Sequence, residues 1–333
     1  MKRINWIDWS KSICMFLVIL GHTHLDDSGL LTKRIIYTFH MPLFFFISGL
    51  LCKNQISIQS IKRDAKFVLI PYLTFGIIGI FIPYPLHFQD IPLYISKLII
   101  GTDSSIGTIW FLPAIFICKM MGSAIISLFH QYRFLSYVIL ALSFLPTLLV
   151  QNIDLPFFAS QALCGLPFFL LGHKYMEYSS FYHISKSSQI ALFAIFIISS
   201  ILTIYLANRH SFVAIAVHSY GNSIFMYYIN AIIGISSVMC ASILLDKYEI
   251  SFVTATAYGS ILILWVHGVF LALFHYYLFR FLNIGTSDYP IWTAILFSIL
   301  SYVLSYGTTI IIDRHCPLLF GLRGCLSNLK GRK

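Results

Sequence analysis

Long apolar runs that contain ionisable side chains constrain this chain most. The first two read NWIDWSKSICMFLVILGHTH and YTFHMPLFFFISG, and they carry Asp8, Lys11, His22 and His40. Of all residues, 58% are hydrophobic and 10% are charged, whereas a soluble domain is about 25% charged. The sequence therefore predicts an all-α polytopic membrane protein. Because an ionisable group within a span costs roughly 2.5–3.5 kcal/mol, these four residues are candidate functional residues.

Apolar stretches of membrane length predict a bundle of about ten transmembrane helices, since each span needs about 20 residues. The first stretch is short, and we expect its helix to extend back through Trp6–Lys11. The predicted spans cover residues 12–24, 35–52, 67–83, 108–129, 134–150, 158–173, 189–207, 222–245, 257–279 and 291–312.

The distribution of positive charge predicts the orientation of the bundle. With the N-terminus in the cytoplasm, 16 of the 22 Lys and Arg residues fall on the inner side, 5 on the outer side and 1, Lys119, within a span. This bias predicts that both termini are cytoplasmic. It also explains the net charge of +10 without a nucleic-acid partner. We expect one membrane domain over residues 1–333, with a core at about 5–312 and a short basic cytoplasmic tail at 313–333, in the cytoplasmic membrane.

Cysteine and histidine spacing offers no metal or disulfide motif. The seven cysteines are odd in number, scattered, and mostly within apolar runs. No HExxH-like or CxxC pattern is present, so we expect no metal and no bound cofactor.

The spacing of Lys11 and His22 places both on one helix face. Eleven residues correspond to about 20° more than three full turns and to about 16 Å along the axis. Asp8 lies three residues before Lys11, and we expect the two to pair. If Lys11 lies at the inner interface, His22 lies roughly halfway through a hydrocarbon core of about 30 Å.

Two further histidines are expected at a similar depth. His40 lies about 20 Å from the inner end of the second span, and His267 lies about 15 Å into the ninth. We therefore expect His22, His40 and His267 to converge, although each could instead be a structurally hydrogen-bonded histidine. Trp110 is either an acceptor contact or an aromatic residue of the interfacial belt. Asn230 is expected to hydrogen-bond across helices in a supporting role.

These residues suit the transfer of a group from a phosphate-bearing donor. A neutral imidazole is a natural base near pH 7, and a cation at the inner mouth suits a phosphate. Acetyl-CoA carries phosphates at one end and a thioester on an arm of about the length that separates Lys11 from His22. His22 would deprotonate an acceptor hydroxyl, with His40 in support.

Several sequence blocks resemble those of a known family. The stretches WIDWSKSICMFLVILGH, FHMPLFFFISG, WFLPAIF, LPFFLLGH and SILILWVHG are similar, in the same order, to the acyltransferase 3 family of membrane acyltransferases, and most to its fucose 4-O-acetylase-like branch. The family pattern of a basic residue, ten residues and a histidine maps to Lys11 and His22. Many members have Arg where this chain has Lys, which offers a point charge instead of a fork.

The resemblance implies an integral membrane O-acetyltransferase that moves acetyl from cytoplasmic acetyl-CoA to a sugar hydroxyl of a cell-surface glycan or its lipid-linked precursor. Together with the family pattern at Lys11 and His22, the residue positions predict donor binding by Lys11 and Asp8 and catalysis by His22 and His40. Trp110, Asn230 and His267 are predicted acceptor or supporting residues. A proton-coupled transporter that uses the intramembrane histidines is the alternative, although transporters often contain internal repeats, and none is evident here. A non-catalytic scaffold would leave the aligned Lys11 and His22 unexplained.

Overall fold

The protein is almost entirely helical. The computed structural model describes residues 3–81, 88–101, 104–178, 186–282, 290–324 and 326. The α-helices are α1 Asn5–Gly21, α2 Leu30–Leu50, α3 Ile58–Phe81, α4 Ile91–Ile100, α5 Phe111–Phe129, α6 Arg133–Leu142, α7 Leu145–Val150, α8 Ala159–Tyr178, α9 Lys186–Arg209, α10 Ile224–Leu244, α11 Ser251–Tyr258, α12 Ser260–Leu282 and α13 Ile291–His315. A two-residue hairpin, β1 Val213–Ala214 and β2 Ser219–Tyr220, pairs antiparallel.

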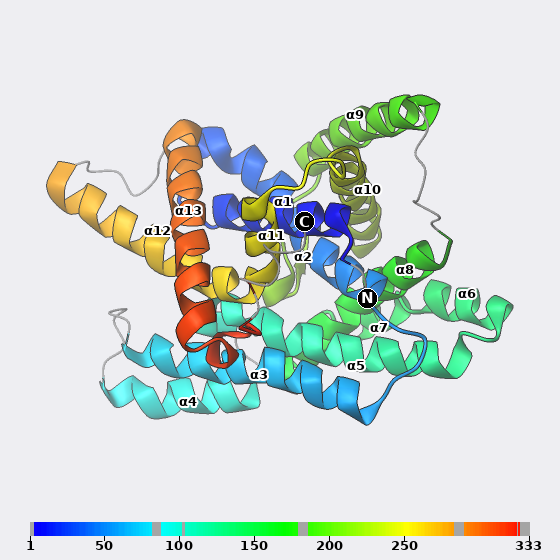
Figure 1. Ribbon diagram of the computed structural model, residues 1–333, viewed down its shortest axis with the longest axis horizontal. Coiled ribbons are helices and arrows are strands. Elements are labelled where there is room, and N and C mark those ends of the chain that lie inside the picture. The colour runs from blue at the N-terminus through cyan, green and yellow to red at the C-terminus, as the bar shows by residue number, and fades with distance from the viewer. Residues whose placement is uncertain are drawn as a thin grey trace.

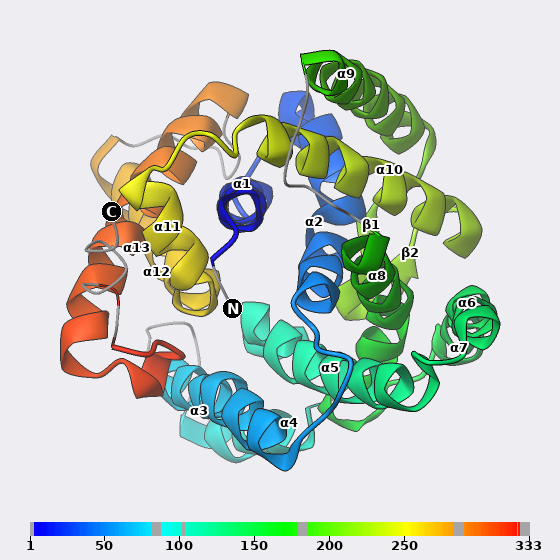
Figure 2. The same cartoon turned by 45° about the vertical axis from the view of Figure 1, so that its right-hand side comes forward.

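Helix α1 lies inside a ring formed by other helices (Figure 2). It contacts α2, α10, α11, α12 and α13, and Cys14, Met15 and Val18 on it are fully buried. Helix α9 lies at the periphery (Figure 1) and exposes Ile190, Ile198 and Ile201, which suits a lipid-facing surface. The helix that carries Asp8 and Lys11 is thus enclosed by other helices, whereas a helix with exposed apolar side chains lies at the periphery.

Seven described helical segments are long and apolar enough to cross a membrane. They are Leu30–Leu50, Gly107–Phe129, Arg133–Val150, Ser188–Arg209, Ile224–Leu244, Ser260–Tyr277 and Ile291–His315. The other three predicted spans form α1, α3 and α8, which are helical but fall outside this set. Helix α1 does start at Asn5, as expected, and has 17 residues. Helix α3 begins at Ile58, nine residues before the predicted span, and its first turns carry Lys62, Arg63 and Asp64.

Two of the predicted spans are interrupted. The span at 134–150 divides into α6 and α7 at Ser143–Phe144, and Pro146 lies in the first turn of α7. A proline lacks the N–H that a continuous helix needs, whereas the first turn tolerates it. The span at 257–279 begins inside α11, and Gly259 separates α11 from α12. The predicted end at Pro83 lies outside the described residues.

Helices α2 and α8 approach each other through glycines. A Cβ added at Gly49 would lie 1.9 Å from the carbonyl oxygen of Phe169, and one added at Gly172 would lie 2.1 Å from that of Phe46. Small residues allow such close packing of helix backbones in membranes. The approach fixes α2, which carries His40, against α8.

We expect Gly172→Ala to destabilise the protein by about 1–3 kcal/mol, because a methyl group at this position overpacks the α2–α8 contact. Gly307→Ala is the matched control, since a Cβ there meets nothing within 4 Å. Thermal unfolding of both variants in the same detergent measures the difference. Equal unfolding temperatures would contradict the close contact.

Candidate active site

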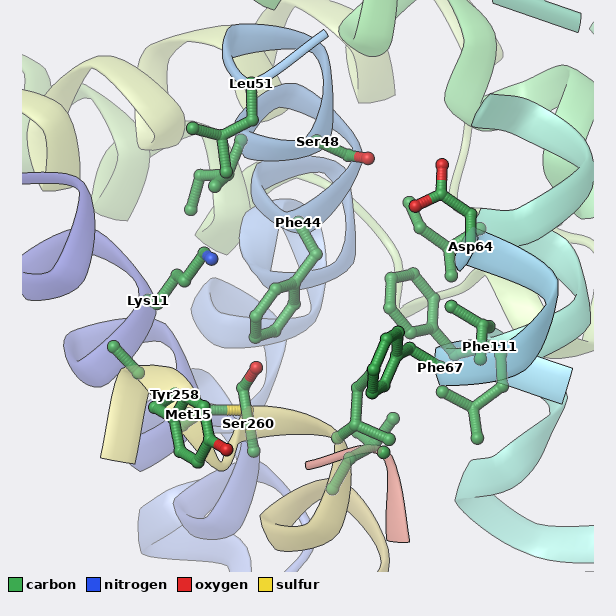
Figure 3. A pocket seen from close by; sticks show the side chains of 18 of the residues that line it. Lys11, Met15, Phe44, Ser48, Leu51, Asp64, Phe67, Phe111, Tyr258 and Ser260 are labelled. Atoms are coloured by element: carbon green, nitrogen blue, oxygen red, sulfur yellow. The ribbon is translucent and has the colours of Figure 1, made fainter. Parts of the chain in front are cut away.

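A charged cavity of about 470 Å³ opens beside Lys11. We call it the lysine cavity. Its walls come from α1, α2, α3, α5, α11 and α12, together with the segment that follows α13. Lys11 points into this space, and Asp64 lies on the opposite side (Figure 3). Phe44, Phe67 and Phe111 contribute apolar side chains to its wall (Figure 3).

Both carboxylates of the lysine cavity are paired with cations other than Lys11. Asp8 forms an ion pair with Arg3, and Asp64 accepts from Lys119 at 2.8 Å and lies 3.3 Å from Arg63. The predicted direct pair between Asp8 and Lys11 is therefore wrong, although the two charges lie close enough to attract each other. Arg3 precedes the first helical residue, and its long side chain reaches Asp8 in the first turn of α1.

Lys11 and Arg323 are the lining cations of this cavity that have no carboxylate within ion-pair distance in the described part of the chain. The charge of Asp8 attracts the Lys11 ammonium, while those of Arg323, Lys119 and Arg3 lie close enough to repel it. Four cations and two carboxylates line the space, so it carries a formal excess of two positive charges. Such a cavity suits an anionic ligand.

A second cavity, of about 230 Å³, contains His22 and His40. We call it the histidine cavity. The Tyr37 ring contacts both histidines, with its centroid 6.0 Å from that of His22 and 4.9 Å from that of His40. His267 does not line this cavity, but its ring contacts His22 edge-on at 5.2 Å between centroids. The three histidines therefore come together, as the helix arithmetic predicted.

Helix carbonyls set the tautomer of all three rings. The Nδ1 atoms of His22, His40 and His267 lie 2.7, 2.8 and 2.8 Å from the carbonyl oxygens four residues earlier. A carbonyl can only accept, so in each neutral ring Nδ1 donates and Nε2 keeps its lone pair. His22 is also the C-cap of α1, where the helix dipole offsets part of the cost of a positive charge. Each ring is thus prepared to accept a proton at Nε2.

Several buried polar groups lack hydrogen-bond partners among the described residues, and two of them belong to predicted site residues. These two are Nε2 of His267 and both amide atoms of Asn230, and these residues are 0% and 1% exposed. The expected interhelical bond of Asn230 is therefore absent. Buried polar groups without partners are costly, which makes both residues candidates for supporting functions.

Trp110 and the β1–β2 hairpin close the histidine cavity. Trp110 is 8% exposed and lines the cavity, so it is not a lipid-facing belt residue. Ala214 and Ala216 in the hairpin line it as well. Gln161 of α8 donates to the Ala216 carbonyl at 3.2 Å, and His218 bonds Asp154 at 2.9 Å. These bonds hold the hairpin over the cavity.

His210, which precedes the hairpin, accepts a hydrogen bond through its ring. Burial lowers the pKa of His210, so the ring is neutral near pH 7. Its Nδ1 then accepts a hydrogen bond from the backbone N–H of Asn222 at 3.2 Å, which ties the start of the hairpin to its end.

The two cavities are neighbours that share one lining residue of α12, and α1 contributes to the wall of the first and ends at the second. Lys11 lines the lysine cavity, His22 lines the histidine cavity, and Leu264 lines both. The single face predicted for Lys11 and His22 therefore runs from one cavity to the other. This arrangement can hold a long ligand with an anionic head beside Lys11 and its reactive end near His22.

Sequence reasoning missed several residues of the site. Lys119 is detectable as the one charged residue in the predicted span at 108–129, but its pairing with Asp64 is not. Tyr37 and Arg323 gave no signal, because they reach the cavities through contacts between distant segments. Among the described residues, no group of three or more His, Cys, Asp or Glu is arranged to hold a metal ion.

The long apolar helices, the exposed apolar surfaces and the two cavities between the helices indicate a multi-pass membrane protein with a candidate site among its helices. A family model described as an acyltransferase domain matches residues 4–314. The match covers nearly the whole chain, so the protein belongs to the acyltransferase 3 family and is a membrane acyltransferase. No curated protein and no solved structure matches the chain.

We expect Asn230→Leu to unfold at a temperature no lower than the wild type, because it removes a buried amide without a partner, a group that costs about 1–3 kcal/mol. Thr147→Val is the contrasting control, since the Thr147 hydroxyl bonds the Tyr228 hydroxyl at 2.7 Å and its loss should lower stability. Thermal unfolding in detergent measures both. A strong loss of stability in Asn230→Leu would show that the amide has a structural bond.

Proposed function

We propose that this protein is an O-acetyltransferase of the cytoplasmic membrane. It moves acetyl from acetyl-CoA to a sugar hydroxyl of a cell-surface glycan or of its lipid-linked precursor. The observation that carries the proposal is the placement of Lys11 and His22 on one helix face, with each lining a different cavity and Leu264 shared between them. The sequence blocks support the fucose 4-O-acetylase-like branch of the family.

The donor is assigned to the lysine cavity. The positive-inside bias supports a cytoplasmic location for Arg3, Lys11 and Arg323, and the excess of cations suits the phosphates of CoA. The extended arm then follows α1 towards His22, about 16 Å away along the helix axis. The thioester would lie near Leu264, which lines both cavities.

The acceptor is assigned to the histidine cavity, where Trp110 offers a flat ring to pack against a sugar. Nε2 of His22 takes the proton of the acceptor hydroxyl, and the oxygen attacks the thioester carbon. The tetrahedral adduct expels the CoA thiolate, which takes that proton back from His22. The products are the sugar acetate and CoA, and no other reactant is required. His40 supports this proton transfer, and the edge contact of His267 orients the His22 ring.

The family assignment gives no support to the alternative function, a proton-coupled transporter. The histidines would serve as a relay in that case, and transport would depend on a proton gradient. Binding separates the two functions, because CoA should stabilise the acetyltransferase against unfolding in proportion to its occupancy.

We expect His22→Ala to lose transfer by a factor of about 10²–10⁴, the usual contribution of a general base, while CoA still protects the protein against unfolding. His24→Ala is the matched control, because His24 is exposed and lies outside both cavities. The O-acetyl content of surface glycans is measured in cells lacking the gene and complemented with each form at equal membrane levels. Full acetylation with His22→Ala would overturn the assignment of the base.

We expect Lys11→Met to raise the KM for acetyl-CoA by about tenfold or more, because it removes one charge-assisted contact with phosphate. Lys11→Arg should retain most of the affinity, since the charge remains. Initial rates in membranes with varied acetyl-CoA test both. If Lys11→Met lowers kcat with an unchanged KM, Lys11 acts on the chemical step and the donor assignment is wrong.

A further inference from the structure

The segment that follows α13 forms one wall of the lysine cavity. Gly321 and Arg323 of this segment both line the cavity. Gly321 has φ of 75°, and a Cβ there would lie 3.0 Å from the Phe67 carbonyl oxygen of α3 and 3.0 Å from the Ile261 side chain of α12. Glycine alone adopts this conformation cheaply and allows the approach. The segment is therefore built to lie against both helices.

Asp313, near the end of α13, anchors the segment. Its carboxylate is 6% exposed and accepts from the Tyr258 hydroxyl at 2.6 Å and from the backbone N–H groups of Gly324 and Leu326 at 3.0 and 2.8 Å. The Tyr258 hydroxyl in turn accepts from the backbone N–H of Arg323 at 2.6 Å. The carboxylate therefore fixes the backbone that follows Arg323 directly and the backbone N–H of Arg323 itself through Tyr258.

The Arg323 side chain is left available by this arrangement. Its backbone forms the anchoring bond, while its guanidinium lies over the ring of Phe67, 5.3 Å from the centroid. It has no carboxylate within ion-pair distance in the described part of the chain, and it is exposed. Phe67 and Lys11 lie on opposite sides of the cavity (Figure 3), so the two unpaired cations approach the space from different directions.

We propose that Arg323 binds a phosphate group of the donor at the mouth of the lysine cavity, and that Asp313 and Tyr258 position it there. This assignment rests on the proposed function. A guanidinium offers a planar fork that matches phosphate, whereas Lys11 offers a single point charge. The other lining cations, Arg3 and Lys119, already neutralise Asp8 and Asp64. The excess charge available to a ligand thus resides on Lys11 and Arg323.

The test measures CoA affinity of the full-length protein in nanodiscs of phosphatidylcholine alone, so that no anionic lipid competes for the site. We expect Arg323→Ala to weaken CoA binding by about tenfold. The variant should also show a shallower loss of affinity with rising salt than the wild type, because one screened charge contact is gone. Arg314→Ala is the matched control, since Arg314 is exposed and does not line the cavity.

Asp313→Asn tests the positioning of Arg323 separately. It keeps the size of the side chain but replaces one acceptor oxygen with a donor, so the segment should loosen and CoA affinity should fall. The salt dependence should stay close to that of the wild type, because Arg323 is still present. If the wild type binds CoA and Arg323→Ala binds it with the same affinity and the same salt dependence, the assignment of Arg323 is wrong while the proposed donor stands. Failure of the wild type to bind CoA would instead overturn the proposed donor.

Discussion

The hydrogen bonds that hold α1 against its neighbours set the geometry of the whole site. The Ser12 hydroxyl lies 2.8 Å from that of Tyr302 and 3.0 Å from that of Thr256, which ties the middle of α1 to α13 and α11. At the start of the helix, the backbone N–H of Trp6 donates to Asp246 and the indole of Trp9 donates to the Tyr248 carbonyl. Because lipid offers no competing partners, these bonds fix α1 in its axial position.

That fixed position determines where two chemically different environments lie. Lys11 is one residue before Ser12, and His22 caps the C-terminal end of the same helix. Lys11 and His22 therefore keep a fixed separation. Because an α-helix rises about 1.5 Å per residue, the sequence separation of two residues on α1 sets their distance along the helix axis. Cys14 adds a further restraint, since its buried thiol donates to the carbonyl of His40 and links α1 to α2 beside the histidine cavity.

Local periodicity was sufficient to predict the parts of the site that lie along single helices. The shared face of Lys11 and His22 and the similar depths of His22, His40 and His267 follow from rise and rotation alone. The pairing of Asp8 was mispredicted for the opposite reason. Asp8 pairs with Arg3, which precedes the helix, and not with Lys11, which lies three residues after it. Helix geometry predicts contacts between residues of one helix but not contacts with residues that precede it.

Lateral contacts between distant segments were beyond prediction from one sequence. The Lys119–Asp64 pair joins α5 to α3, and Arg323 reaches the cavity only because Asp313 and Tyr258 hold the segment after α13. Pro146 indicates the break between α6 and α7 in the sequence, but the apolar composition of residues 134–150 favoured one continuous span. Asn230 shows the limit of a general expectation, since buried amides usually find partners and this one has none among the described residues.

The lysine at position 11 becomes understandable once the surrounding charges are considered. Arginine at this position, as in many family members, would bring a larger cation among Arg3, Lys119 and Arg323. Lysine is compact and leaves more of the cavity open, while Arg323 supplies a planar fork from another wall. If the donor is a CoA thioester, Lys11 on α1 supplies a point charge, and Arg323 on the segment after α13 supplies bidentate recognition. A single arginine at position 11 could combine these two functions. The substitution then changes the location of phosphate recognition without removing it.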